Sequence, residues 1–230
     1  MAVTPLVLAG GRSTRMQSPK HLLRMPDGRP LYQHQIAILA RACPQSPVIY
    51  VSLAQDSQLD GFLRERVVAA KFDENETSRD EMACSDVRVI FDLDANETSE
   101  SSGPASGLLA AFASQPENTW LVIPCDCPFV SVELLEKLRR QYRPPVTCYR
   151  NNKGFCEPLV GLWSPDALAR LAERAKDGKV GPSSVVRELG GKQIELPAGA
   201  DRPLADVNTK DEWETALALL NTSGGTVSGG

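Results

Sequence analysis

Short apolar runs alternate along this chain with longer segments that have helical spacing. The apolar runs have the length of strands, and in the first half of the sequence they predict strands over residues 3–8, 47–52, 87–91 and 119–123. The segments between them place apolar residues three or four positions apart, which predicts helices over residues 31–40, 59–70 and 105–113.

The second half of the sequence continues this pattern and marks where its helices begin. Ser131 precedes a stripe of leucines, and Ser164 is followed by a proline, which suits the first helical position. Residues 209–212 match a capping box before the last helix. Two further strands are predicted over residues 146–149 and 158–163.

The alternation of strands and helices indicates the fold class. Nearly continuous apolar strands predict an α/β, three-layer, Rossmann-like fold with a mostly parallel sheet covered on both faces. We expect one domain over residues 1–220, because no proline- or glycine-rich linker divides it. The acidic segment 71–86 indicates a polar surface insertion, and residues 221–230 a flexible tail. Ligands of such sheets bind at the carboxyl ends of the strands.

Composition and charge exclude several partners. The 230 residues are 42% hydrophobic and 23% charged, as in ordinary globular proteins. The net charge of −4 argues against nucleic acid. No apolar run approaches the ~20 residues of a membrane helix. No basic stretch precedes the first apolar run, which argues against a signal peptide. We therefore expect a cytoplasmic protein that binds neither nucleic acid nor membrane; its oligomeric state is not indicated.

The cysteines and histidines do not suggest a metal site of their own. The chain has six cysteines and two histidines, and no C-x-x-C pair occurs. The cysteines are expected to be reduced, several of them in the core. Cys125 and Cys127, which flank an aspartate, are interpreted as packing residues.

The first predicted strand runs directly into two adjacent glycines, Gly10 and Gly11, followed by Arg15 and Lys20. Glycine lets the backbone approach a ligand closely, and consecutive N–H groups in such a turn form a concavity that binds anions. Arginine and lysine add positive charge that suits phosphate. The loop therefore predicts a bound nucleoside triphosphate, although a Gly-Gly pair alone is as consistent with a simple turn.

The spacing of this loop excludes two other glycine loops. The P-loop requires a glycine followed by lysine five positions after its first glycine, where this chain has Arg15 or Met16. The dinucleotide fingerprint requires three glycines spaced G-x-G-x-x-G, whereas Gly10 and Gly11 are adjacent.

Asp126 lies just after the fourth predicted strand, from which Pro124 and Cys125 separate it. A carboxylate at this position lies at the rim of the crevice, near the predicted phosphates, and the two negative charges need a cation between them. Mg²⁺ takes oxygen ligands, often one or two carboxylates together with substrate phosphates. We therefore predict Mg²⁺ at Asp126; a carboxylate that only caps a turn is the alternative.

Four further side chains are singled out with less specific signals. Asn208 follows a short strand predicted around Leu204; it offers an oxygen to a metal or merely precedes the last helix. Asp92 follows the third strand and either accepts a hydrogen bond from a nucleoside or closes an ordinary turn. His21 is expected at the surface. Glu157 begins a strand that could face a second substrate.

The order of these motifs resembles that of the molybdenum cofactor guanylyltransferases and their nucleotidyltransferase relatives. The resemblance spans about residues 4–220 and begins with Leu-Ala-Gly-Gly-x-x-x-Arg-Met-x-x-x-Lys over residues 8–20. It continues with Gly-Arg-Pro-Leu at 28–31, Gly-Pro-x-x-Gly at 103–107, Pro-Cys-Asp-Cys-Pro at 124–128, Glu-Pro-Leu at 157–159 and Asp-Val-Asn-Thr at 206–209.

The resemblance implies a nucleotidyltransferase domain with the nucleotide-diphospho-sugar transferase fold. It implies Mg²⁺-dependent transfer of GMP from GTP to molybdopterin with release of pyrophosphate. Carried over by motif, the backbone of Leu8, Ala9, Gly10 and Gly11 holds the base and phosphates. Arg15 and Lys20 pair with the phosphates. Asp92 lies by the nucleoside, and Asp126 ligates Mg²⁺ with Asn208 as a second ligand.

Three alternatives to this function stay open at the level of sequence. The first is the cytidylyltransferase of the same cofactor, which more often has alanine where this chain has Gly10; the extra room suits a purine. The second is a sugar-phosphate nucleotidyltransferase. The third is a non-catalytic nucleotide-binding protein, which the family departures at Gln17, Pro19 and Ser52 keep open.

Overall fold

One sheet of seven strands organises the part of the chain that the structure describes. The computed structural model describes residues 2–11, 16, 18–72, 86–93, 103–196 and 202–224, and the side chains of residues 68–72, 104, 223 and 224 lie outside the description. The strands are β1 (Thr4–Leu8), β2 (Val48–Leu53), β3 (Asp86–Phe91), β4 (Trp120–Pro124), β5 (Val146–Arg150), β6 (Cys156–Trp163) and β7 (Lys192–Glu195).

The strand order, β3-β2-β1-β4-β6-β5-β7, confirms the predicted mostly parallel sheet. Strands β1 to β4 run parallel, and β6 is antiparallel to both of its neighbours, β4 and β5. The chain leaves β1 toward β2 and β3 and then returns to place β4 on the other side of β1. Such a reversal opens a ligand crevice at the carboxyl ends of the two central strands.

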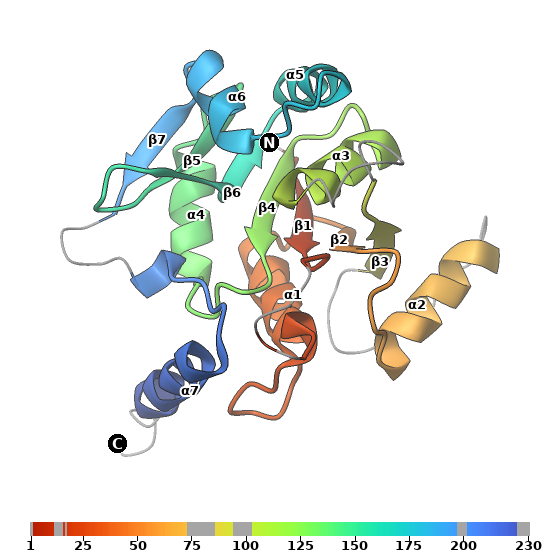
Figure 1. Cartoon of the computed structure of the whole chain (residues 1–230), viewed down its shortest axis with the longest axis vertical. Coiled ribbons are helices and arrows are strands. Elements are labelled where there is room, and N and C mark those ends of the chain that lie inside the picture. Colours follow the sequence, from red (N-terminus) through yellow and green to blue (C-terminus); the bar gives the residue numbers. More distant parts are fainter. Residues whose placement is uncertain are drawn as a thin grey trace.

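Strand register brings the ends of β1, β2 and β4 to one level. Leu8 is the partner of Ser52 on one side and of Pro124 on the other. The loops that follow these residues therefore begin side by side at the same edge of the sheet. In Figure 1 the arrows of β1 and β4 point toward this edge, in the lower half of the view.

Helices cover both faces of the sheet and so make three layers (Figure 1). One face packs against α1 (Leu31–Ala42), α2 (Gly61–Phe72) and α4 (Val132–Arg140); the other packs against α3 (Pro104–Ser114), α5 (Pro165–Lys176) and α6 (Pro182–Glu188). A last helix, α7 (Lys210–Gly224), and the short 3-10 helices η1 (Lys20–Leu22) and η2 (Arg202–Leu204) complete the described elements.

Side chains that alternate along the strands lie in two separate hydrophobic cores, one on each face of the sheet. Leu6 lies with Trp120 in the core under α3 and α5, whereas Val7 lies in the core under α1 and α4. This alternation explains why the central strands β1, β2 and β4 are apolar along nearly their whole length, because both of their faces are buried. A third cluster joins Met16 and Val207 to Trp213 and thereby docks α7 beside the loops at the carboxyl edge.

The predicted helix starts of the second half are confirmed. The Ser131 hydroxyl accepts a hydrogen bond from the Leu134 amide at 3.2 Å, and Ser164 does the same for Ala167 at 3.2 Å. The capping box before α7 is also formed, because the Glu212 carboxylate accepts from the Thr209 amide at 3.0 Å.

Other predictions from the sequence need correction. The chain around Leu204 forms the 3-10 helix η2 and not a strand, because this segment joins no strand of the sheet. Helix α6 and strand β7 were not predicted. The predicted insertion 71–86 contributes the end of α2 and the start of β3, and its residues 73–85 lie outside the described residues. The predicted flexible tail 221–230 is wrong for residues 221–224, which form the end of α7, and residues 225–230 lie outside the described residues.

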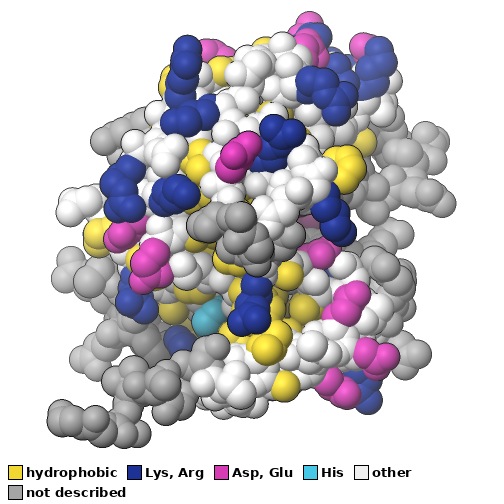
Figure 2. All heavy atoms as spheres, turned by 90° about the vertical axis from the view of Figure 1, so that its left-hand side faces the viewer, with side chains coloured by type: hydrophobic (Ala, Val, Ile, Leu, Met, Phe, Trp, Pro, Cys, Tyr) yellow, Lys and Arg dark blue, Asp and Glu magenta, His cyan; other side chains and the backbone are white. Residues whose placement is uncertain are grey.

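Charged side chains are scattered over the face that carries the β7 edge (Figure 2). Figure 2 shows lysines and arginines mostly on the upper half of the face that carries the β7 edge, with acidic side chains among them. Charged side chains at a sheet edge discourage pairing with a second sheet. Among the described helices, none combines the length and apolar character that crossing a bilayer requires.

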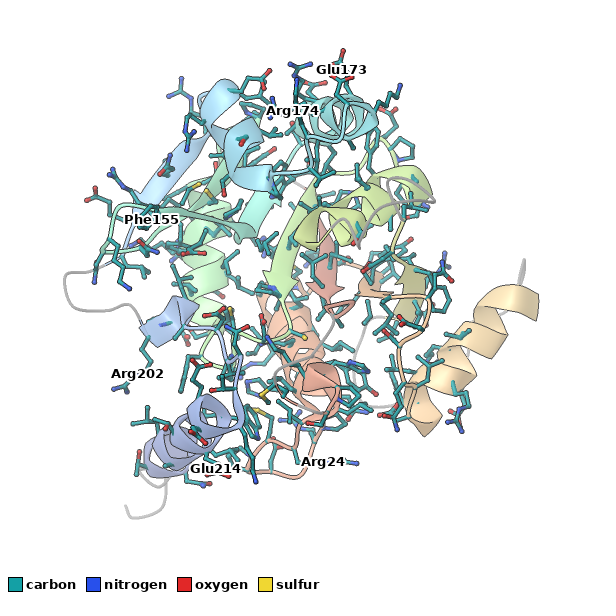
Figure 3. The ribbon with its side chains drawn as sticks, in the orientation of Figure 1. Arg24, Phe155, Glu173, Arg174, Arg202 and Glu214 are labelled. Atoms are coloured by element: carbon teal, nitrogen blue, oxygen red, sulfur yellow. The ribbon has the colours of Figure 1, made fainter. Side chains whose placement is uncertain are left out.

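An ion-pair cluster joins α5 to α6 at the upper end of the molecule. Arg174 lies 2.8 Å from Glu188, and Arg170 contacts Glu188 and Glu173. Figure 3 shows Glu173 and Arg174 at the end opposite to Arg24 and Glu214, away from the carboxyl edge. The cluster therefore holds two helices together and is separate from the ligand crevice.

Candidate active site

A pocket of about 420 Å³ opens at the carboxyl ends of β1 and β4. It brings together six of the residues that the sequence predicts for the site: Leu8, Gly10, Gly11, Lys20, Asp92 and Asp126. The remaining lining comes from Ala54, Gln55, Asp56, Gly103, Ser106, Gly107, Pro124, Cys125 and Leu159. The pocket thus lies where the strand order predicts a ligand.

Three predicted residues stand apart from this lining, namely Ala9, Arg15 and Asn208, although Asn208 contacts the lining residue Lys20. Ala9 belongs to the same strand–loop junction, but its side chain is buried in the core and its amide donates to the Ser52 carbonyl at 2.8 Å. Arg15 lies outside the described residues, so its predicted contact with phosphate stays a prediction.

Gly10 is required by the close approach of neighbouring chain segments. A Cβ atom at this position would lie 1.9 Å from the Asp92 carboxylate and 2.9 Å from the Ala54 amide nitrogen. A Cβ at Gly11 would meet nothing within 4 Å. The first glycine therefore lets the loops after β1, β2 and β3 come together, and the second leaves open space on the pocket side.

Asp92 is held in place by two serine hydroxyls. Ser52, at the end of β2, donates to one carboxylate oxygen, and Ser106, in α3, donates to the other at 3.3 Å. Both serines are buried. Their hydroxyls hold the carboxylate at the end of the pocket away from Asp126. The sequence gives little sign of Ser106, which appears only as one small residue within the motif at 103–107.

Lys20, Asp126 and Asn208 meet at the opposite end of the pocket. The Lys20 ammonium donates to the Asp126 carboxylate at 2.8 Å and to the Asn208 side-chain oxygen at 2.8 Å. The ion pair is mostly shielded, since the side chains of Lys20 and Asp126 are 15% and 24% exposed. The Asn208 amide in turn donates to Asp206 at 2.6 Å. Two oxygen atoms from distant segments therefore converge on one positive charge.

Backbone hydrogen bonds fix the loop that carries Asp126. The Cys125 amide donates to the Leu8 carbonyl at 2.9 Å, which joins the loop to β1. The Asp126 carbonyl accepts from the Val207 amide at 2.9 Å, which brings the segment with Asn208 alongside. The proximity of Asp126 and Asn208 is thus built into the main chain.

The thiols beside Asp126 are buried, which confirms their interpretation as packing residues. Burial raises the pKa of Cys125 and of Cys127 well above the ordinary thiol value, and the charge of Asp126 adds to the effect. A thiol held protonated is a weak nucleophile and a poor metal ligand. The aspartate is therefore the group in this loop that offers chemistry.

His21 corrects a prediction from the sequence, because its side chain is buried and not at the surface. It is 4% exposed, and its Nε2 lies 2.8 Å from the Gln58 carbonyl oxygen. Burial lowers the pKa of this imidazole. The contact ties the turn that carries Lys20 to the loop after β2, whose residues Gln55 and Asp56 line the pocket.

Glu157 lies near Asp206 at the start of β6. Burial raises the pKa of its carboxyl, and the charge of Asp206 acts in the same direction. Asn151 donates to Glu157 at 2.8 Å. The predicted contact of Glu157 with a second substrate stays a prediction.

The metal-ligating capacity of the described residues is small. Among them, no three histidine, cysteine, aspartate or glutamate side chains are grouped so that they could hold an ion. A metal at Asp126 would therefore need oxygen atoms from a substrate, as Mg²⁺ bound to nucleotides commonly does.

Comparison with models of protein families identifies the family of this chain. Residues 5–194 match the model of the MobA-like NTP transferase domain. The chain belongs to this family.

Two curated relatives illustrate the similarity in sequence. A molybdenum cofactor biosynthesis bifunctional protein of Synechocystis is 31% identical over 211 residues, which are 90% of this chain and 52% of the relative. The chain therefore spans about half the length of that protein. A molybdenum cofactor guanylyltransferase of Serratia proteamaculans is 24% identical over 95% of this chain and 98% of the relative.

Solved structures show the same fold. The molybdopterin-guanine dinucleotide biosynthesis protein A of Archaeoglobus fulgidus has a TM-score of 0.66 at 19% identity, and the match covers 96% of this chain and 100% of the other. A Mycobacterium tuberculosis protein solved in complex with manganese has a TM-score of 0.58 at 19% identity and covers 95% of this chain and 99% of its own.

Proposed function

We propose that this protein is a divalent-metal-dependent guanylyltransferase that transfers GMP from GTP to molybdopterin and releases pyrophosphate. The family supports the reaction type. Relatives named molybdenum cofactor guanylyltransferase support the nucleotide and the acceptor. The geometry of the pocket supports both a triphosphate and a cation.

One observation carries the proposal: the Lys20 ammonium lies 2.8 Å from both Asp126 and Asn208 at the wall of the pocket. A carboxylate and a neutral oxygen that converge on one cation form a donor set that suits Mg²⁺ or Mn²⁺. The ammonium stands where a divalent ion would contact the same two oxygens. The residues present therefore fit a metal that is completed by substrate phosphates.

Asp126 and Asn208 would hold this ion, and the ion would supply positive charge to the triphosphate and to the departing pyrophosphate. Lys20 would then be released from the two oxygens, because two cations repel each other at such short range. Its flexible stem lets the ammonium turn to the phosphates. Lys20 thus neutralises Asp126 before substrate binds and the nucleotide afterwards.

The chemical step is an in-line displacement at phosphorus. A phosphate oxygen of the acceptor forms a bond to the α-phosphorus of GTP, the bond from that phosphorus to the bridging oxygen breaks, and pyrophosphate leaves with the electron pair. The acceptor is already an anion, so the protein supplies position and charge and needs no general base. The amides of the Gly10-Gly11 loop would donate to the phosphates.

The nucleoside would occupy the end of the pocket near Asp92. The Asp92 carboxylate, oriented by Ser52 and Ser106, can accept hydrogen bonds from a ribose hydroxyl or from the N–H groups of guanine. Gly10 lets the Asp92 carboxylate and the Ala54 backbone come together at this end, because a side chain there would meet both.

Pyrophosphate release tests the proposal. The purified protein is incubated with molybdopterin, Mg²⁺ or Mn²⁺, and either GTP or CTP. We expect release with GTP that requires both the metal and the acceptor. Faster release with CTP would replace the guanylyltransferase by a cytidylyltransferase. Release that sugar phosphates support better than molybdopterin would reassign the acceptor, and no release with any of them would leave a non-catalytic nucleotide-binding protein.

A further inference from the structure

The buried side chain of Gln35 contacts the loop that carries Asp126. Gln35 lies on α1 and has 0% exposure. Its amide nitrogen donates to the Cys127 carbonyl at 2.8 Å and lies 3.5 Å from the Cys125 carbonyl. One amide group therefore reaches the carbonyl oxygens on both sides of the aspartate.

This contact completes the restraint of the loop. The carbonyl of Asp126 itself accepts from Val207, and the Cys125 amide is bonded to Leu8. Gln35 is the side chain, among the described hydrogen bonds, that acts on the two flanking carbonyls. Because the backbone on either side of Asp126 sets the direction of its Cα–Cβ bond, the amide restrains the position from which the carboxylate reaches Lys20.

Burying a polar amide at this position lowers the stability of the fold. Its neighbours Ile36 and Leu39 on the same helix are apolar and buried. The Gln35 side-chain oxygen is buried without a hydrogen-bond partner among the described residues. Burying an unsatisfied polar atom destabilises a protein, so an apolar side chain of similar size would suit the core better. The amide therefore contributes through the contacts of its N–H groups with the carbonyls of the Asp126 loop.

We propose that Gln35 is a positioning residue for metal binding, which it serves by orienting the Asp126 carboxylate. The inference rests on the proposed function, since it assumes that Asp126 ligates a divalent ion. Residues that orient a metal ligand through a hydrogen bond typically contribute about tenfold to 100-fold to metal affinity.

The test compares Gln35→Met with Gln33→Met in the whole 230-residue chain. Both changes remove an amide from α1 and keep a side chain of similar size, but Gln33 donates to Tyr32 and not to the Asp126 loop. Mn²⁺ affinity is measured by electron paramagnetic resonance in the presence of GTP. Binding of GTP without metal is measured by thermal shift in EDTA. Asp126→Asn serves as the reference for loss of the metal ligand.

We expect Gln35→Met to fold, to bind Mn²⁺ about tenfold to 100-fold more weakly, and to bind metal-free GTP like the wild type. Gln33→Met should match the wild type in both measurements. Unchanged Mn²⁺ affinity, or equal losses of Mn²⁺ and GTP affinity, would show that Gln35 only supports the core. Wild-type protein that binds Mn²⁺ no better than Asp126→Asn would remove the metal site itself and overturn the proposed function together with this inference.

Discussion

The Lys20 ammonium and the Asp126 carboxylate form an ion pair of 2.8 Å between positions 106 residues apart in the sequence. Lys20 lies in η1, directly after the glycine loop, and Asp126 follows β4. This ion pair joins the glycine-loop motif at residues 8–20 to the Pro-Cys-Asp-Cys-Pro motif at residues 124–128.

Replacing Lys20 by methionine tests its role with the phosphates. Methionine keeps much of the length of the stem but removes the charge, so GTP affinity or turnover should fall about 100-fold. Isothermal titration calorimetry with GTP and steady-state kinetics provide the measurement. Lys176→Met, at the exposed end of α5, is the matched control and should leave both values unchanged. Wild-type kinetics in Lys20→Met would contradict the assignment.

Replacing Asp126 by asparagine keeps the shape of the side chain and removes its negative charge. We expect turnover to fall by about 100-fold or more, because a divalent ion contributes several kcal/mol to stabilising the transferred phosphate. The melting temperature should stay close to that of the wild type. Glu117→Gln, an exposed change just before the same strand, controls for the loss of a carboxylate. A folded Asp126→Asn protein with normal turnover would exclude the metal role.

The two adjacent glycines should respond differently to alanine. In Gly10→Ala the new methyl group meets Asp92 and the Ala54 backbone, which should cost about 1–3 kcal/mol of stability and weaken GTP binding. Gly11→Ala meets no atom within 4 Å and should change stability by less than about 0.5 kcal/mol. Urea unfolding of both variants gives the comparison, and equal losses would show that the loop differs from this geometry.

Glu157 and Glu133 should have opposite effects on the pH dependence of stability. Burial raises the pKa of Glu157 above its usual 4.5, so the protonated form favours folding at low pH and this contribution is lost as pH rises through the folded-state pKa. Glu157→Gln should therefore melt at a higher temperature than the wild type at pH 7 and match it near pH 4.

The pKa of Glu133 is lowered by hydrogen bonds from its own backbone amide and from Ser131, at the start of α4. Its charged form therefore favours folding above the usual pKa, and this contribution is lost as pH falls through the folded-state pKa. Glu133→Gln should melt below the wild type at pH 7 and approach it in acid. Melting curves from about pH 3 to pH 8 measure both variants, and shifts of the same sign in both at pH 7 would contradict these environments.

The sequence predicts the elements whose burial is periodic. Strands β1, β2 and β4 are predictable because both of their faces are buried, and α4 and α5 because of their caps and apolar stripes. Strand β7 escaped prediction because Ile194 is its one buried residue, and α6 because it has seven residues and buries only Val185 and Val186. Elements this short leave no repeating pattern.

Parts of the site escaped prediction because they depend on tertiary contacts. The burial of His21 follows from Gln58 and Tyr32, and its own sequence neighbours give no sign of it. Gln35 left a weak signal, namely an amide on the same helix face as Leu31 and Leu39. A polar residue on an otherwise apolar helix face is worth testing as a contact to a functional loop.

The hydrogen bond from Val207 to the Asp126 carbonyl has a consequence for defining the smallest fragment that keeps the site. The matched family domain ends at residue 194, yet Asn208 contacts Lys20 and Trp213 helps to anchor α7. A fragment cut at that boundary would lose Asn208, which supplies one of the two oxygen atoms that contact Lys20. It would also lose Val207, whose amide holds the segment of Asn208 beside Asp126. Expression designs and fusion junctions should therefore keep α7 attached.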